Sequence, residues 1–190
     1  FLLISSNMGN SNGIQSFSEV IRMHRDLGYF ERNPLLFNEL FEQRAEDVLK
    51  TSDFIEAINH LAKSNNKYDI VFRPHPTEDI DIWKFYFRGM SNVHVIQEGS
   101  ITVWVNNAFA VMHNGCTTAL ETLFIGKPLI TYLPSKRKYK MNLPNKLGFQ
   151  INSLKKLNEK VNFLLKNSKS KNKIQYKKTP KLISQRIYSD

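Results

Sequence analysis

The sequence is poor in cysteine, with Cys116 alone among 190 residues. A single thiol cannot form a disulfide within the chain, which is typical of a protein from a reducing compartment. We expect Cys116 to be a packed thiol rather than a nucleophile. One cysteine and scattered histidines give no zinc-ligand spacing, so we expect no metal site. Three of the histidines, His24, His60 and His94, are expected on the surface or on helix faces.

Long apolar runs are also lacking. No stretch approaches the roughly 20 apolar residues that a membrane helix needs. The opening Phe1-Leu2-Leu3-Ile4 is too short for a signal peptide and has no basic leader. We therefore expect a cytoplasmic location, extending to the inner face of the membrane. The chain begins inside an apolar run without an initiator methionine, which indicates a piece of a longer protein.

Acidic residues are scarce at the end of the chain. Residues 151–190 carry eleven Lys or Arg and two acidic residues, whereas the first 150 carry sixteen and fifteen. We expect one domain over residues 1–167 and a basic extension over 168–190, either partly disordered or packed as a terminal helix. Such a tail attracts acidic membrane lipid, although a solvated end remains the alternative. It lacks the interleaved aromatics that stack bases, so we expect no specific nucleic-acid partner.

The pattern of apolar residues predicts alternating strands and helices. Alternation of this kind is typical of parallel βαβ units, so we predict an α/β fold: a Rossmann-like, doubly wound parallel sheet with helices on both faces. The helix over 33–64 carries a possible break at Thr51-Ser52. The expected strands are residues 1–5, 68–72, 93–97, 108–113 and 128–134, and the expected helices are residues 16–30, 33–64, 101–108, 117–126 and 152–168.

Polar loops follow four of these strands. In a parallel sheet ligands bind beyond the carboxyl ends of the strands, so we expect the loops at residues 7–13, 73–78, 98–100 and 113–118 to face one edge. The motifs G-x-G-x-x-G and G-x-x-x-x-G-K-[ST] are both absent. The common dinucleotide and P-loop modes of binding therefore lack their motifs.

Small polar residues separate the fourth strand from its helix. Asn114, Gly115, Thr117 and Thr118 stand where a helix start offers free N–H groups, which suits a phosphate. The alternative is plain capping by Asn114 or Thr117. Glu121, one turn later, is expected to accept bonds from sugar hydroxyls or to be a solvated first-turn residue.

A second basic loop is Arg73-Pro74-His75-Pro76, at the end of the second strand. The planar guanidinium of Arg73 and the imidazole of His75 suit a phosphate group. The two prolines stiffen the loop. A polar turn with exposed side chains is the alternative.

These two segments, "VFRPHP" and "HNGCTTALETLFIGKPLITYLP", resemble the C-terminal, donor-binding half of GT-B glycosyltransferase-like proteins. More narrowly they are similar to the bacterial surface-carbohydrate (capsule and lipopolysaccharide) biosynthesis family. The resemblance implies a CMP- or UDP-sugar as substrate, no further cofactor, and a glycan or lipid-linked acceptor. It covers residues 1–134, with the helix up to Lys166 as a closing element.

The resemblance also implies residue roles. Arg73, His75, Asn114, Gly115, Thr117 and Thr118 would hold the donor phosphate. Glu98, Ser100, Glu121, Asn7 and Gly9 would contact the nucleotide or sugar. The acceptor-binding N-terminal half is not visible in this sequence, so catalytic residues stay unassigned. Two alternatives stay open: a sugar-nucleotide epimerase of the same fold, whose acid–base carboxylates are not evident, and a non-catalytic nucleotide-binding or docking module.

Overall fold

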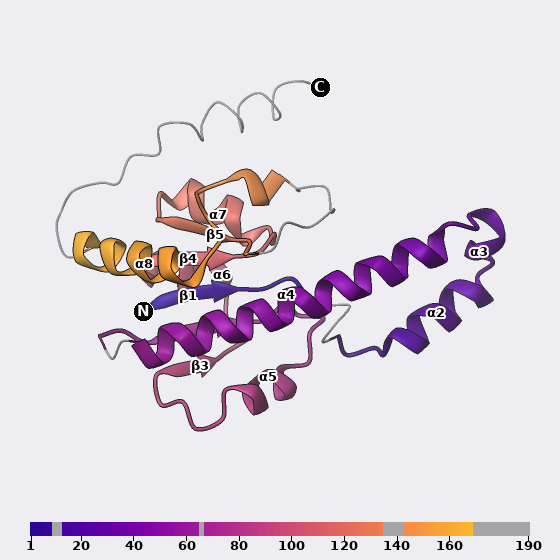
Figure 1. The fold of residues 1–190 in the computed structure, drawn as a ribbon, viewed down its shortest axis with the longest axis horizontal. Helices are drawn as coiled ribbons and strands as arrows, with labels where there is room; N and C mark the ends of the chain where they lie inside the picture. Colours follow the sequence, from indigo (N-terminus) through magenta and orange to yellow (C-terminus); the bar gives the residue numbers. More distant parts are fainter. Residues whose placement is uncertain (9–12, 65–66, 135–142, 169–190) are drawn as a thin grey trace, which may run out of the picture. The chain divides into compact units, whose positions relative to one another are not determined.

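The computed structural model describes residues 1–8, 13–64, 67–134 and 143–168. The chain divides into two compact units: unit 1 comprises Phe1–Ser5 and the chain from Gly99 onward, and unit 2 comprises Ser6–Glu98. The strands are ordered β3-β2-β1-β4-β5-β6 in one sheet. This is the strand order of doubly wound Rossmann-type folds, and every pairing within each unit is parallel (Figure 1), so the predicted α/β fold is confirmed.

The strands of unit 1 form its core. β1 (Leu2–Ser5), β4 (Ala110–His113) and β5 (Leu129–Tyr132) are buried along their whole length. Strands that are buried throughout and mostly apolar are typical of parallel sheets covered on both faces. The remaining strand, β6 (Phe149–Ile151), was not predicted, because three residues with an exposed Gln150 in the middle give almost no pattern.

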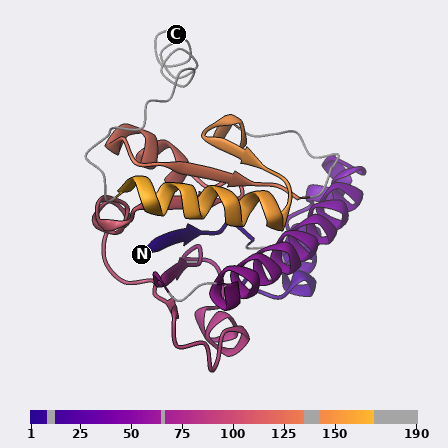
Figure 2. The same cartoon turned by 60° about the vertical axis from the view of Figure 1, so that its left-hand side comes forward.

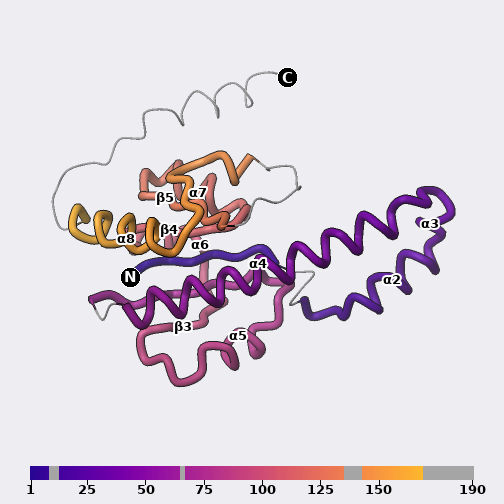
Figure 3. Tube along the Cα trace, in the orientation of Figure 1, coloured from indigo at the N-terminus to yellow at the C-terminus, as the bar shows by residue number. Residues whose placement is uncertain are grey.

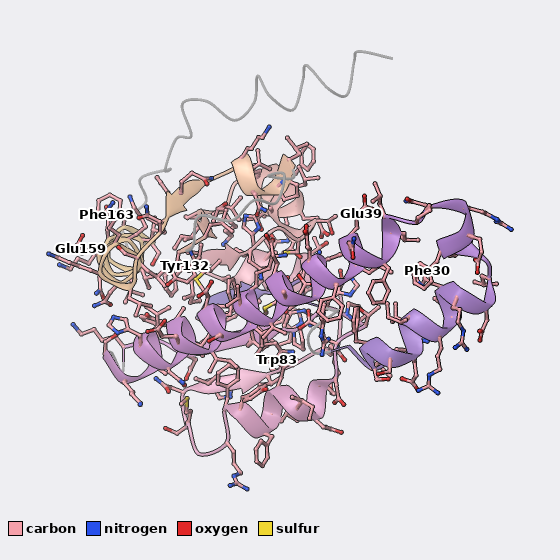
Figure 4. The ribbon with its side chains drawn as sticks, turned by 45° about the vertical axis from the view of Figure 1, so that its right-hand side comes forward. Phe30, Glu39, Trp83, Tyr132, Glu159 and Phe163 are labelled. Atoms are coloured by element: carbon pink, nitrogen blue, oxygen red, sulfur yellow. The ribbon has the colours of Figure 1, made fainter. Side chains whose placement is uncertain are left out.

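The helices of unit 1 begin and end close to the predicted positions. α6 (Ile101–Asn107) packs against α7 (Thr118–Ile125), which ends at Gly126 with φ 78°. α8 (Leu154–Ser168) lies across one face of the strands (Figure 2). It buries Leu157, Val161 and Leu164, at the spacing of one helix face, whereas Glu159 and Phe163 lie on its exposed side (Figure 4).

Unit 2 begins with a helical hairpin. α2 (Phe17–Asp26) starts at Ser16, which forms a capping box with Glu19. The short α3 (Tyr29–Arg32) turns the chain into α4 (Leu36–Ser64), a helix of 29 residues (Figure 3). The predicted break at Thr51-Ser52 is wrong. The Thr51 hydroxyl donates to the carbonyl oxygen of Asp47 one turn earlier, so it is satisfied inside the helix.

Aromatic side chains join the two arms of this hairpin. The rings of Phe17 and Phe41 lie 5.6 Å apart, edge to face. Phe30 lies between α2 and α4 (Figure 4), with its ring 5.8 Å from that of Phe37. Edge-to-face pairs of this kind stabilise by about 0.5–1.5 kcal/mol beyond their buried area. The hairpin is therefore held at its outer end by ring contacts.

The rest of unit 2 contains β2 (Ile70–Arg73), β3 (Val93–Val95) and α5 (Ile80–Tyr86). Phe72, Trp83 and Phe87 form an aromatic core between these elements, with the Phe72 and Trp83 rings 4.6 Å apart. Figure 4 labels Trp83. α5 is capped by Asp79, whose side chain accepts from two backbone N–H groups. No described helix is both long enough and apolar enough to cross a membrane.

Candidate nucleotide-binding loops

The predicted site residues divide between the two units. Asn7, Arg73, His75 and Glu98 lie in unit 2, and Ser100, Asn114, Gly115, Thr117, Thr118 and Glu121 lie in unit 1. Gly9 lies outside the described residues. The remaining site residues lie in or next to the loops that follow β1 to β4, except Glu121, which lies inside α7.

The loop after β2 is organised around the carboxylate of Glu78, which is 1% exposed. Its Oε1 accepts the backbone N–H of His75 at 3.1 Å and that of Met8 at 3.0 Å. Its Oε2 accepts the indole N–H of Trp83 at 2.8 Å. The Ser6 hydroxyl lies 2.9 and 3.0 Å from the two oxygens. Both oxygens are therefore used by donors of the protein itself.

His75 is exposed beside this buried centre. Its Nδ1 accepts the backbone N–H of Thr77 at 3.2 Å and lies 2.7 Å from the Thr77 hydroxyl. A neutral imidazole that accepts at Nδ1 carries its proton on Nε2. The Nε2–H of His75 is therefore available as a donor at the end of β2.

Arg73 is bonded to the loop that follows β3. Its guanidinium donates to the carbonyl oxygens of Gln97, at 3.1 Å, and Glu98. Burial lowers the pKa of Arg73, and the charge of Glu98 acts in the opposite direction. The side chain of Gln97 in turn donates to the carbonyl oxygen of His75 at 3.0 Å. Arg73 thus ties together two loops of unit 2.

In unit 1 the turn after β4 is anchored by His113, which is fully buried. Its Nδ1 accepts the backbone N–H of Gly115 at 3.0 Å, so its Nε2–H donates to the Thr131 hydroxyl at 2.8 Å. That hydroxyl donates to the carbonyl oxygen of Leu147 at 2.6 Å. Burial lowers the pKa of His113 to about 3, so the ring is neutral in this chain of bonds.

Gly115 has a φ of 127°, which favours glycine. A Cβ atom at this position would lie 3.1 Å from the side-chain amide of Asn145. Another residue at this position would be strained by the φ and would push the Asn145 amide aside by a few tenths of an ångström. These are reasons for glycine that do not involve the predicted phosphate. Asn145 belongs to η1 (Leu143–Lys146) and was not singled out from the sequence, because nothing in "LPNK" marks a partner thirty residues away.

The start of α7 departs from plain capping. Thr117 is the N-cap residue, but its side chain makes no capping hydrogen bond, and it is exposed. Thr118 is buried, with its hydroxyl 3.1 Å from that of Ser5 on β1. The Cys116 thiol donates to the same Ser5 hydroxyl at 3.3 Å. Burial raises the pKa of Cys116, which supports its role as a packed thiol.

Two further predicted residues lie beside these turns. Ser100 is the exposed N-cap residue of α6 and makes no capping bond with its side chain. Glu121 accepts a bond from the Thr102 hydroxyl at 3.3 Å, which joins α7 to α6. Within the described residues, no group of three or more His, Cys, Asp or Glu side chains is arranged to hold a metal ion.

Glu78 and His113 are the residues that sequence reasoning undervalued. Glu78 lies three residues after His75 and directly before Asp79, which caps α5, so its place in the sequence is that of an ordinary helix start. His113 was taken as the end of a strand. A buried histidine next to Asn-Gly was the available signal, but its partner Thr131 lies 18 residues later.

Comparisons with known proteins show the fold. No protein-family model matches the sequence, and no curated protein matches it. The structure is similar to the crystal structure of the UDP-GlcNAc 2-epimerase of Methanocaldococcus jannaschii in complex with UDP-GlcNAc and UDP, with a TM-score of 0.52 and 15% identity. The match covers 97% of this chain and 44% of that one, so the chain spans less than half of that protein's length. The likeness shows the fold alone, which is a Rossmann-like α/β fold.

Proposed function

We propose that this chain is the donor-binding half of a GT-B glycosyltransferase-like protein and binds a nucleotide-activated sugar, a CMP- or UDP-sugar, by its phosphates. The observation that carries the proposal is the loop after β2. There an exposed His75 has its Nε2–H free to donate, because Thr77 occupies the other ring nitrogen. The fold likeness to a protein solved with UDP-GlcNAc and UDP supports the same ligand class.

The proposed roles follow the sequence interpretation. Arg73 and His75 contact the donor phosphate from the loop after β2, and Gly115, Thr117 and Thr118 contact it from the start of α7. Asn7, Glu98 and Ser100 contact the nucleotide, and Glu121 contacts the sugar. Asn114 is a further contact to the phosphate, and Gly9 is a further contact to the nucleotide or sugar. The acceptor is a glycan or a lipid-linked sugar of surface-polysaccharide synthesis, at the inner face of the membrane.

The chemistry required of these residues is stabilisation of a leaving group. When a glycosyl group leaves a nucleotide, negative charge builds up on the departing phosphate. N–H donors fixed in advance at a helix start, together with a histidine donor, stabilise that charge with no rearrangement during the reaction. Catalytic residues and the acceptor site are left to the remainder of the longer protein.

An epimerase is the second candidate, favoured by the fold likeness to a UDP-GlcNAc 2-epimerase. Epimerisation at C2 requires a group that removes a proton and one that returns it. Glu78 is a poor candidate for either role, since its oxygens already accept four donors of the protein. Deuterium incorporated from D2O at C2 of UDP-GlcNAc by the full-length protein would favour the epimerase over the transferase.

The proposal is tested with a ligand panel. Thermal shift and titration calorimetry against UDP-, CDP- and CMP-sugars should show one class that raises the melting temperature with concentration. For that ligand, His75→Ala and Thr117→Ala should be made singly and together. Both residues are exposed, so neither substitution removes core packing. If the two act on one phosphate, their effects will not add. The absence of binding across the panel would contradict the proposed function.

A further inference from the structure

The carboxylate of Glu78 joins three separate segments of unit 2. Its four donors come from the segment after β1 (Ser6 and Met8), from His75 in the loop after β2, and from Trp83 on α5. A carboxylate offers about four acceptor positions, so these donors use its full capacity. Such a group is more than a helix-start residue.

We call the Glu78 carboxylate and its four donors the Glu78 clamp. The part of the clamp formed by Trp83 is rigid. Trp83 is fully buried and packs edge to face on Phe72, with their rings 4.6 Å apart. Its indole N–H therefore fixes one carboxylate oxygen relative to the aromatic core. Because the carboxylate is planar, the second oxygen is fixed as well, and it is this oxygen that accepts from both loop amides.

The other part of the Glu78 clamp is formed by the segments after β1 and β2. Each of these segments carries an exposed residue that is predicted to contact the ligand, Asn7 after β1 and His75 after β2. Asn7 lies between Ser6 and Met8, which both bond to Glu78, and the backbone N–H of Ser6 also donates to the carbonyl oxygen of Arg73 at 3.3 Å. His75 bonds to Glu78 through its own backbone. Two loops that are about 70 residues apart in sequence are thus held against one buried group.

We infer that Glu78 is a positioning residue, which presents the side chains of Asn7 and His75 together to an anionic nucleotide ligand. This inference rests on the proposed function. The carboxylate takes up the backbone N–H groups of Met8 and His75, so those amides are not available to a ligand. It leaves the side chains of Asn7 and His75, both exposed, as the recognition groups. The position of the Glu78 carboxylate holds the two loops in place for binding. Its negative charge, by contrast, is unfavourable for binding an anion.

Two substitutions separate position from charge. Glu78→Asp keeps the charge but withdraws the carboxylate by about 1.5 Å, so it cannot reach the indole and both loop amides at once. Glu78→Gln keeps the length, and its one carbonyl oxygen can still accept from Met8 and His75 while the indole loses its acceptor. Glu78→Asp should weaken binding by about tenfold, and Glu78→Gln should leave the affinity within about twofold or improve it.

The experiment uses the nucleotide sugar that the panel selects, or UDP if none is selected. Affinity is measured by calorimetry, and hydrogen exchange of the Met8 and His75 amides is measured by NMR. Glu78→Asp should speed exchange at these two amides, and Glu78→Gln should not. Leu61→Ala, which truncates a fully buried side chain on α4, is the control for stability loss alone. It should lower the melting temperature and keep the affinity.

Each outcome decides the inference. It is overturned if Glu78→Asp binds as well as the wild type, or if Leu61→Ala loses as much affinity. If Glu78→Asp does not fold, Ser6→Ala replaces it. That variant removes one donor of the clamp and should weaken binding in the same direction. If the wild type binds no probe, the proposed function fails. Faster exchange in Glu78→Asp would then show a clamp that holds the loops for structural reasons only, and the positioning role would be rejected.

Discussion

His75 is the residue on which the binding proposal can be tested most directly. His75→Ala removes the exposed Nε2–H donor and should cost about 1.5–3 kcal/mol of binding free energy, which is roughly ten- to a hundredfold in affinity. His94→Ala is the matched control, because His94 is also an exposed histidine of unit 2 and pairs with Asp69 at 3.3 Å. Calorimetry should show weaker binding for His75→Ala alone. Equal affinity in both variants would remove His75 from the site.

His113 predicts a dependence of stability on pH. Its pKa is lowered by burial from 6.5 to about 3 in the folded chain. The unfolded chain therefore takes up this proton first, and folding stability falls as the pH falls from about 6.5 toward 3. The full effect of one such group is about 1.4 kcal/mol per pH unit. Urea unfolding at pH 7, 6, 5 and 4 should show a steeper loss for the wild type than for His113→Gln. Parallel curves would show that His113 is accessible to protons.

Single residues of the site were only partly predictable. The positions of Arg73 and His75 at the end of β2 followed from the sequence, because R-P-H-P directly follows an apolar run. The bonds of Glu78 could not be predicted, since Ser6 is 72 residues away and only the folded sheet brings the two together. The same holds for Asn145 beside Gly115. Local patterns predict where a side chain lies along the chain, and tertiary packing decides its partners.

At the scale of elements, the approach of β6 to β5 depends on a glycine. Gly148, directly before β6, has a φ of 70°, and a Cβ atom there would lie 2.5 Å from the carbonyl oxygen of Leu129. Gly126 at the end of α7 has a similar φ of 78° but nothing within 4 Å. Gly126→Ala should therefore cost only the backbone term of about 1–2 kcal/mol. Gly148→Ala should cost a further 1–3 kcal/mol or so from overpacking.

Chemical denaturation of both glycine variants measures the difference. The two substitutions share the same change of side chain and nearly the same backbone angle, so their difference reports the contact with Leu129. Equal losses of unfolding free energy would mean that β5 and β6 move apart at little cost. A larger loss for Gly148→Ala would confirm the close approach.

Most elements were predictable because their patterns are local. Among the described residues, five of the six strands and the helices around Ser16, Thr117 and Leu154 begin near the predicted residues. The helix expected over residues 16–30 is instead two helices, α2 and α3, and α5 and η1 are not among the expected helices. Two other differences have separate causes. β6 is too short and too polar to produce a pattern. Thr51-Ser52 has the composition of a helix break, but the Thr51 hydroxyl donates to the Asp47 carbonyl oxygen inside α4, so the helix continues.

For the whole molecule, we predict that the basic extension is dispensable for folding. Its high charge and few apolar residues cannot offset the entropy of ordering. Deleting residues 169–190 keeps α8 complete, including the Ser168 hydroxyl that donates to the Leu165 carbonyl oxygen. The melting temperature should change by less than about 2–4 °C, the shift that 1 kcal/mol produces at this size.

A longer deletion provides the contrast. Removing the chain from Leu154 onward also removes Leu157, Val161 and Leu164, which are fully buried. Their loss costs several kcal/mol by the usual large-to-small values, enough to unfold a marginally stable domain. If the shorter deletion is as damaging as the longer one, the extension packs on the body and the domain boundary near residue 167 is wrong.

The long helix of unit 2 has a practical consequence. Buried residues of α4 begin only at Asp47, and residues 36–46 include none. The outer end of the hairpin therefore contributes little to the core of β2, β3 and α5. An epitope or a fluorescent protein spliced in after Gly28, at the tip, would be displayed without disturbing that core. The tip of the hairpin is thus a site for attaching a tag with which the protein can be captured or imaged.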